Sequence, residues 1–239
     1  MTATSKADGG AFMGILMLDT AFPRLPGDIG NPATFDFATR RQIVSGAHPD
    51  RIVLEDASNW LPPFTRAARK LEEQGAHLIT TSCGFLAPFQ EALEAAVQIP
   101  VLTSSLHLYH RIAASLDAGK QVGILTISPG TLSETHLGCA AIPANTIIGG
   151  LSAESHFRCS ILENRTTLDR QKSECEHVAA ACAMQTEHPQ LGAILLECTN
   201  MPPYAAAIAA TTGLPVYSIN SGLEAIWHNR PLEPVVSQP

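Results

Sequence analysis

The sequence contains two copies of one pattern, and this internal repeat constrains the fold more than any other feature. The segment LITTSCGFLAPFQEALEAAVQIPVLTSS is echoed further along by AILLECTNMPPYAAAIAATTGLPVYSIN. In both copies an apolar run ends at a cysteine, a proline-containing helical segment follows, and a Pro-Val pair begins the next apolar run. Cys83 precedes Pro100 by 17 residues, and Cys198 precedes Pro215 by the same 17 residues. Repetition of this kind predicts two structurally similar lobes.

A second echo marks the start of each half, where Gly14–Leu16 is matched by Gly123–Leu125 at the opening of an apolar run. Short apolar runs alternate with helical patterns along the whole chain, which is typical of a parallel sheet flanked by helices. We therefore expect an α/β fold with two lobes related by a pseudo-two-fold axis. The expected division is a first lobe of residues 11–105 plus 213–239, a second lobe of residues 106–212, and a flexible N-terminus of residues 1–10.

Individual elements are predicted from apolar runs and helical spacing. The expected strands are Met13–Leu18, Arg51–Leu54, His77–Thr80, Val101–Thr103, Gln121–Ile127, Thr146–Ile148, Ala193–Leu196 and Val216–Ser218. The expected helices are Phe64–Gln74, Pro88–Val97, Leu106–Leu116, Leu168–Met184 and Pro203–Thr211. The segment Asp19–Pro32 is rich in proline and glycine, so it is predicted to be a long structured loop at a strand end, where sites commonly form.

Composition excludes several classes of partner. The 239 residues include 15 basic and 22 acidic side chains, for a net charge of −7, and no basic cluster interleaves with aromatics. This pattern argues against nucleic acid as the main partner. Hydrophobic residues make up 45% and charged residues 15%, which predicts a sizeable core. No apolar run is long enough for a membrane span and no export signal is visible, so a cytoplasmic location is expected.

The two matched cysteines are the candidate catalytic residues. Each follows a strand and precedes a helix, a position at the carboxyl edge of a sheet where ligands bind in open α/β folds. The helix N-terminus is expected to lower the pKa of the thiol. A pseudo-two-fold axis would place Cys83 and Cys198 on opposite faces of a substrate carbon, so that one removes a proton and the other returns it. Such chemistry inverts a stereocentre.

Substrate-binding groups are expected beside these cysteines, where N–H and hydroxyl donors can stabilise charge on a substrate carboxylate. The predicted set is Asp19, Ser82, Gly84, Phe85, Ser128, Gly130, Thr131, Thr199 and Asn200. Asp19, Asp28 and Glu197 are either orienting groups for the thiols or solvated capping residues. Arg24 either holds a distal carboxylate or lies on the surface.

Other chemistries find little support in the residues. Cys139, Cys159, Cys175 and Cys182 lack CxxC spacing and are interpreted as small apolar residues in a reduced compartment. The histidines are scattered, and His107 with His110 forms a lone i, i+3 pair, so no metal site is expected. No Walker loop, GxGxxG or GxSxG motif is present, and no cofactor is expected.

The motifs TSCGF around Cys83 and LECTNMPPY around Cys198, set in two similar halves, resemble the cofactor-independent aspartate/glutamate racemase superfamily. That superfamily also includes hydantoin racemases, maleate isomerases and arylmalonate decarboxylases, and the resemblance extends over residues 14–220. It implies two lobes of parallel sheet, homodimers or larger homo-oligomers, and no pyridoxal phosphate. By this resemblance the two cysteines are the acid-base pair, and Thr199 and Asn200 bind the carboxylate of a small substrate.

The runs LDTAFPRLPGDIGNPATFDF, CGFLAPFQ and ECTNMPPYAAAIAATTGLPVY are also similar to the branch that contains the algal dimethylsulfoniopropionate lyases. Those enzymes remove a proton next to a carboxylate and expel dimethyl sulfide. Gly84 and Phe85 stand where a symmetric amino-acid site would mirror Thr199 and Asn200. The sequence thus predicts an aspartate/glutamate-type racemase, with a lyase as the first alternative and a non-catalytic carboxylate-binding protein as the second. A decarboxylase ranks lower because it would keep one active cysteine.

Overall fold

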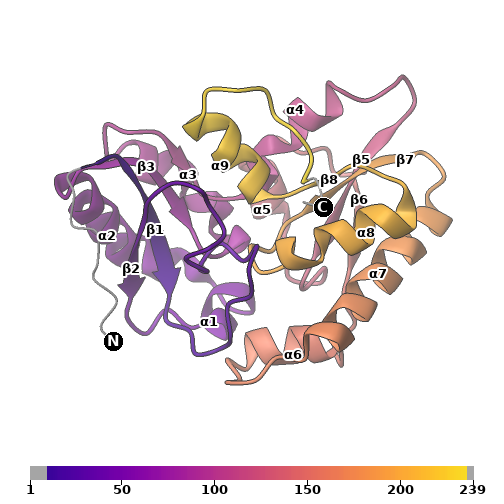
Figure 1. The fold of residues 1–239 in the computed structure, drawn as a ribbon, viewed down its shortest axis with the longest axis horizontal. Coiled ribbons are helices and arrows are strands. Elements are labelled where there is room, and N and C mark those ends of the chain that lie inside the picture. Colours follow the sequence, from indigo (N-terminus) through magenta and orange to yellow (C-terminus); the bar gives the residue numbers. More distant parts are fainter. Residues whose placement is uncertain (1–9, 236–239) are drawn as a thin grey trace.

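The computed structural model describes residues 10–235, which form two four-stranded parallel sheets in separate halves of the ribbon (Figure 1). Strand order is β2-β1-β3-β4 in the first sheet and β6-β5-β7-β8 in the second, so both sheets have the same topology. The α/β class and the two similar lobes predicted from the repeat are confirmed. The strands are β1 Phe12–Leu18, β2 Thr39–Val44, β3 Ala76–Thr81, β4 Val101–Leu102, β5 Gln121–Thr126, β6 Ile147–Gly150, β7 Leu191–Leu196 and β8 Val216–Tyr217.

The repeat extends to the register of the central strands. In the first sheet Leu16 of β1 pairs with Thr81 of β3, and in the second Leu125 of β5 pairs with Leu196 of β7. Each pairing also shifts register after the first residue of the leading strand, β1 or β5. Because parallel strands all end at the same edge, the turns after β1 and β3, and those after β5 and β7, gather at one edge of each sheet.

Helices cover the sheets. The α-helices are α1 Pro49–Val53, α2 Leu61–Glu73, α3 Gln90–Glu94, α4 Tyr109–Ala113, α5 Glu134–Gly138, α6 His156–Leu162, α7 Arg170–Glu187, α8 Ala205–Thr212 and α9 Ile219–Trp227. Short 3-10 helices are η1 Ala57–Trp60, η2 Gly84–Phe89, η3 Ser105–Leu108 and η4 Pro202–Tyr204. The longest helix, α7, is capped by Asp169, whose side chain accepts a hydrogen bond from the Lys172 N–H and so satisfies one free donor of the first turn. None of the helices within residues 10–235 combines the length and apolarity that crossing a bilayer requires.

The repeated glycines allow helices to approach the central strands closely. A Cβ at Gly14 of β1 would lie 2.8 Å from Leu71 Cδ1 of α2. A Cβ at Gly123 of β5 would lie 2.5 Å from Leu191 Cδ1 and 3.2 Å from Met184 Cε of α7. The Gly-Ile-Leu echo in the sequence therefore reflects a packing requirement at equivalent points of the two lobes.

This packing predicts the effect of a methyl group at Gly123. We expect Gly123→Ala to lower the free energy of unfolding by about 1–3 kcal/mol, because overpacking forces neighbouring side chains out of place. A Cβ at Gly138 of α5 would meet no atom within 4 Å, so Gly138→Ala is the matched control and should change stability by less than about 1 kcal/mol. Urea denaturation of both variants measures the difference, and equal midpoints would contradict the packing argument.

Two details of the sequence prediction are wrong. Residues 51–54 were expected to form a strand, but they belong mostly to helix α1 because Pro49 occupies its first turn, where proline favours a helix start. The corresponding sheet position is taken by β2, whose sequence TRRQIV is polar because it is a largely exposed edge strand. Helices α5, α6 and α9 were not predicted.

The boundary after the second lobe also differs from the prediction. Strand β8 pairs with β7, so the second sheet continues to Tyr217, beyond the expected end at residue 212. Helix α9 then packs against β4 and η3 of the first lobe. Thus the chain returns to the first lobe only after β8, because the Pro-Val pair at Pro215 opens a strand of the second sheet. The expected flexible segment 1–10 lies outside the described residues except for Gly10.

Candidate active site

Both matched cysteines line a single pocket at the carboxyl ends of the central strands. The pocket encloses about 320 Å³ of space free of protein atoms, part of it open to solvent. Both thiols are buried, with 8% of Cys83 and 7% of Cys198 exposed. Segments of both lobes meet here, and the lining consists of Leu18, Thr20, Phe22, Pro49, Val53, Ser82, Cys83, Gly84, Phe85, Ile127, Ile161, Glu197, Cys198 and Asn200.

The two cysteines occupy equivalent places in their lobes. Each lies two residues beyond the end of its strand, Cys83 after β3 and Cys198 after β7. The backbone N–H two residues on, that of Phe85 for Cys83 and that of Asn200 for Cys198, acts to lower the pKa of each thiol. These N–H groups are positioned to stabilise a thiolate if one forms.

The resting state of these cysteines differs from the prediction. No α-helix begins at either cysteine: η2 follows Cys83 as a 3-10 helix, and α8 begins seven residues after Cys198. Burial raises the pKa of both thiols above the ordinary range, and the Glu197 carboxylate raises both further. The expected lowering by a helix N-terminus is therefore wrong, because desolvation outweighs the local N–H groups. At neutral pH both cysteines are protonated in the free protein.

Hydrogen bonds between the lobes hold the two strand ends together. The Thr199 hydroxyl donates to the Ser82 carbonyl at 2.7 Å, and the Ser105 hydroxyl donates to the Leu196 carbonyl at 2.8 Å. All of these groups are buried, so the bonds are shielded from water. Thr199, a predicted substrate-binding residue, therefore uses its hydroxyl proton to join the lobes.

A chain of polar side chains fixes Asn200 beside Cys198. The Asn200 amide donates to Asp28 Oδ2 at 2.7 Å, and the Cys198 thiol donates to Asn200 Oδ1 at 3.6 Å. Asp28 is only 2% exposed and is paired with Arg24 at 3.0 Å. Arg24 also donates to Thr20, which lines the pocket. The loop predicted between residues 19 and 32 thus orients the pocket residue Asn200 through Asp28.

The structure places some of the other predicted substrate-binding residues in the pocket and others outside it. Ser82, Gly84, Phe85 and Asn200 line the pocket with the cysteines, whereas Asp19 accepts a hydrogen bond from the Gly46 N–H at 3.0 Å and anchors the turn after β2. Ser128 is buried in the turn after β5. Gly130 and Thr131 line a neighbouring groove of about 990 Å³, which shares Val53 and Phe85 with the pocket. A role for these residues in substrate binding stays a prediction.

Most of the apolar lining was missed by the sequence analysis. Pro49 and Val53 come from α1, which was misread as a strand, and Ile161 comes from α6, which was not predicted. Phe22 and Thr20 lie in the proline-rich loop, where spacing carries no sign of which side chains turn inward. Glu197, by contrast, is a candidate from the sequence, because it is an acidic residue placed directly after the apolar run AILL.

Glu197 is the most unusual polar group of the pocket. It has no exposed surface, and its Oε2 accepts a hydrogen bond from the Thr126 hydroxyl at 2.8 Å. Its Oε1 has no hydrogen-bond partner among residues 10–235. Burial raises the pKa of the carboxyl to about 7, although the Thr126 hydrogen bond acts in the opposite direction. The carboxyl therefore exchanges its proton near neutral pH.

The raised pKa of Glu197 predicts a dependence of stability on pH. The proton is bound more tightly in the folded state, so its stabilising effect is complete below the ordinary pKa of 4.5 and is lost as the pH rises to about 7. The loss amounts to ~3 kcal/mol. Glu197→Gln has no carboxyl to ionise and should not show this loss of stability. Its free energy of unfolding relative to that of the wild type should therefore rise between pH 4.5 and pH 8. Denaturant unfolding at several pH values measures this gap, and a constant gap would contradict the assignment.

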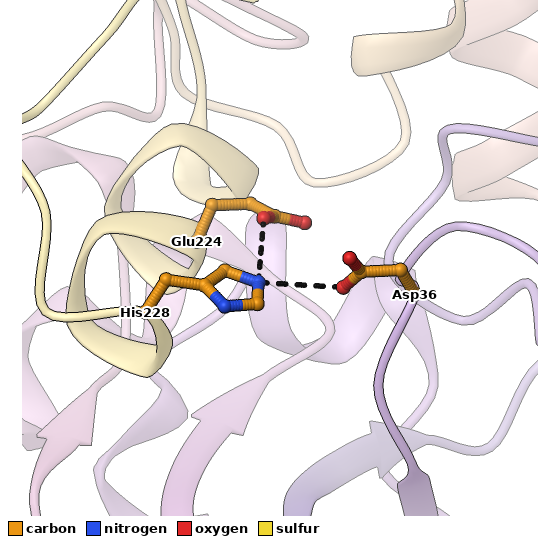
Figure 2. Close-up of side chains that lie close together, drawn as sticks. All are labelled: Asp36, Glu224 and His228. Carbon is orange, nitrogen blue, oxygen red and sulfur yellow. Dashed lines mark ion pairs between the residues drawn. The ribbon is translucent and has the colours of Figure 1, made fainter.

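One further cluster of titratable side chains lies outside the pocket, where Asp36, Glu224 and His228 meet on the surface (Figure 2). His228 Nε2 is 3.3 Å from Asp36 Oδ1 and 3.4 Å from Glu224 Oε2. Arg230 also pairs with Glu224 Oε2, at 3.0 Å. Because this arginine already supplies a cation to the carboxylate, the cluster is explained as an ion-pair network that ties α9 to the segment before β2.

The sequence model of the family described as Asp/Glu/Hydantoin racemase matches residues 42–223. The chain therefore belongs to this family of enzymes, as the resemblance of its two cysteine motifs implied.

Curated relatives are similar over most of the chain. A dimethylsulfoniopropionate lyase from Durusdinium sp. clade D is 29% identical over 219 residues, which are 87% of this chain and 71% of the lyase. Dimethylsulfoniopropionate lyase 7 of Emiliania huxleyi (strain CCMP1516) is 28% identical over 239 residues, with 91% of this chain and 67% of the lyase covered. Lyase 5 of the same strain is 28% identical over 220 residues, but only 42% of its length is matched.

Solved structures share the fold. Arylmalonate decarboxylase has a TM-score of 0.56 at 16% identity, with 86% of each chain covered. Glutamate racemase from Bacillus anthracis has a TM-score of 0.58 at 13% identity, covering 95% of this chain and 85% of the racemase. At these identities the likeness establishes the two-lobed architecture alone.

Proposed function

We propose that this protein is a cofactor-independent enzyme in which Cys83 and Cys198 move a proton at the carbon next to a carboxylate. The observation that carries the proposal is the shared pocket, which both thiols line from equivalent positions of their lobes. General acid-base catalysis needs groups within reach of one reacting proton, and two lobes supply one group each. The catalytic thiol has to lose its proton before it can act as a base.

Within this chemistry we favour elimination over inversion. A substrate such as aspartate or glutamate carries a second carboxylate, and no lysine or arginine among residues 10–235 lines the pocket to receive it. Most of the lining is apolar, and the two strand ends differ, with Gly84 and Phe85 on one side and Thr199 and Asn200 on the other. These features suit a small monocarboxylate with a leaving group on the β-carbon. The names of the curated relatives agree with this choice.

In the proposed reaction one cysteine thiolate takes the α-proton of a β-dimethylsulfonio carboxylate. The electron pair of the C–H bond is first delocalised onto the carboxylate and then forms the C=C bond, while the C–S bond breaks with its electrons leaving on neutral dimethyl sulfide. The thiol then returns its proton to solvent. The second cysteine lies on the other side of the same carbon, where its thiol supplies a hydrogen-bond donor. Cytoplasmic location and assembly as a homodimer are further expectations that accompany this proposal.

Proton NMR in D₂O tests the reaction. With dimethylsulfoniopropionate we expect vinyl signals of acrylate, and with L-aspartate, L-glutamate or a hydantoin we expect no loss of the α-proton signal. Exchange of the α-proton of an amino acid, together with its opposite enantiomer, would establish racemisation instead. A protein that leaves all four compounds unchanged would favour the non-catalytic binding alternative.

Substitution of either pocket cysteine should suppress this activity. We expect the serine variant of the cysteine that acts as the base, Cys83→Ser or Cys198→Ser, to lower the turnover rate by about 10²–10⁴-fold, because a serine hydroxyl ionises far less readily than a thiol. The other variant keeps a hydrogen-bond donor and should lose less activity. Cys175→Ser is the matched control, since Cys175 is an exposed cysteine of α7, and its rate should equal that of the wild type. The turnover rate of each variant is measured from the formation of acrylate. Full activity in both pocket variants would exclude the two-cysteine mechanism.

A further inference from the structure

Glu197 breaks the symmetry between the lobes. The residue that precedes each pocket cysteine is Ser82 in the first lobe and Glu197 in the second. Ser82 Oγ accepts a hydrogen bond from the Leu18 N–H at 2.8 Å, so it is engaged in the packing of its own sheet. Glu197 uses Oε2 for the equivalent task, through Thr126 of β5, and its Oε1 finds no hydrogen-bond partner in the described part of the chain. One ionisable carboxyl is thus added to an otherwise matched site.

Glu197 is one of the pocket-lining residues, and its Oε1 lies against Gly84. Glu197 and Gly84 both line the pocket, and a Cβ at Gly84 would overlap Glu197 Oε1 and the Glu197 carbonyl oxygen. The absence of a side chain at Gly84 is therefore what leaves room for this carboxyl. A buried polar oxygen without a partner is costly, and such atoms call for an explanation. A polar ligand bound in the pocket would supply such a partner.

The charges around the pocket restrict which ligand that can be. The loop after β1 contributes Arg24 and Asp28, which compensate each other in an ion pair. The turn after β3 contributes the Cys83 thiol, and that after β7 the Cys198 thiol and the Glu197 carboxyl. Strand β5 contributes only the Thr126 hydroxyl. A substrate carboxylate that enters while Glu197 is ionised would face an uncompensated negative charge in a buried site.

We propose that Glu197 acts in its protonated form, and that Oε1 donates a hydrogen bond to the carboxylate of the bound ligand. This inference rests on the proposed function, because it presupposes that the pocket receives a small carboxylate. A neutral carboxyl is a hydrogen-bond donor in an apolar site, and its hydrogen bond to an anion strengthens as negative charge grows on the carboxylate after removal of the α-proton. Glu197 then binds the substrate and stabilises the intermediate at the same atom.

A pair of thiol reagents tests this contact without knowledge of the natural substrate. Iodoacetate is a small carboxylate and iodoacetamide is its neutral counterpart, and both alkylate only the thiolate. The ratio of their rates at one cysteine therefore cancels the thiolate fraction and reports on recognition of the carboxylate. Peptide mass spectrometry gives this ratio separately for Cys83 and Cys198, with Cys139 and Cys175 as exposed references in the same sample.

In the wild type we expect the iodoacetate preference of the pocket cysteines to exceed that of the references below pH 7. Above pH 7 it should fall by about tenfold per pH unit, as Glu197 loses its proton. Glu197→Gln keeps a hydrogen-bond donor without a charge, so its preference should persist at every pH. Glu197→Met keeps the length of the side chain without a donor, so its ratio should equal that of the references. Thermal unfolding checks that both variants are folded.

The outcomes separate this inference from the proposed function. A wild-type preference that does not change between pH 6 and pH 9, or one that survives in Glu197→Met, would overturn the role of Glu197 and leave the carboxylate pocket standing. Pocket cysteines that show no preference for iodoacetate at any pH would overturn carboxylate binding itself, and the role of Glu197 with it.

Discussion

The hydrogen bonds between the two strand ends are the constraint on which the site depends. Thr199 donates to the Ser82 carbonyl and Ser105 to the Leu196 carbonyl, so the turns that carry the cysteines are held against each other. A sheet alone offers its carboxyl edge to solvent, whereas two edges joined in this way enclose a pocket in which both thiols and Glu197 are buried. Burial of the thiols and of Glu197 follows from this closure, and the raised pKa values follow from the burial.

Much of the architecture could be predicted because the sequence repeats one pattern in both halves. The spacing from each cysteine to its Pro-Val pair predicted the lobes, and the strand ends at Cys83 and Cys198 followed from it. Edge strand β2 could not be found in the same way, because an exposed strand lacks the apolar run that marks its buried neighbours. Helix α1 was misread because its short sequence PDRIV has too few residues to show helical spacing.

The chemistry of the site was harder to predict than its location. Sequence position suggested that a helix N-terminus would favour thiolates, but the sign of a pKa shift depends on how deeply a group is buried, and burial arises from both lobes together. The importance of Glu197 could not be predicted for the same reason. Only the structure shows that Gly84 leaves room for its carboxyl and that Oε1 has no hydrogen-bond partner among residues 10–235. A motif identifies which residues meet, whereas their protonation depends on the surroundings.

Burial of the pocket thiols also affects how this protein responds to oxidative stress. Peroxides oxidise the thiolate form of cysteine, and susceptibility follows both thiolate content and access. Cys83 and Cys198 are buried and protonated at rest, whereas Cys175 is exposed on the surface of α7. A brief peroxide pulse should therefore modify surface sulfur first and spare the pocket. The high pKa that keeps each pocket thiol protonated thus also protects it from oxidation between turnovers.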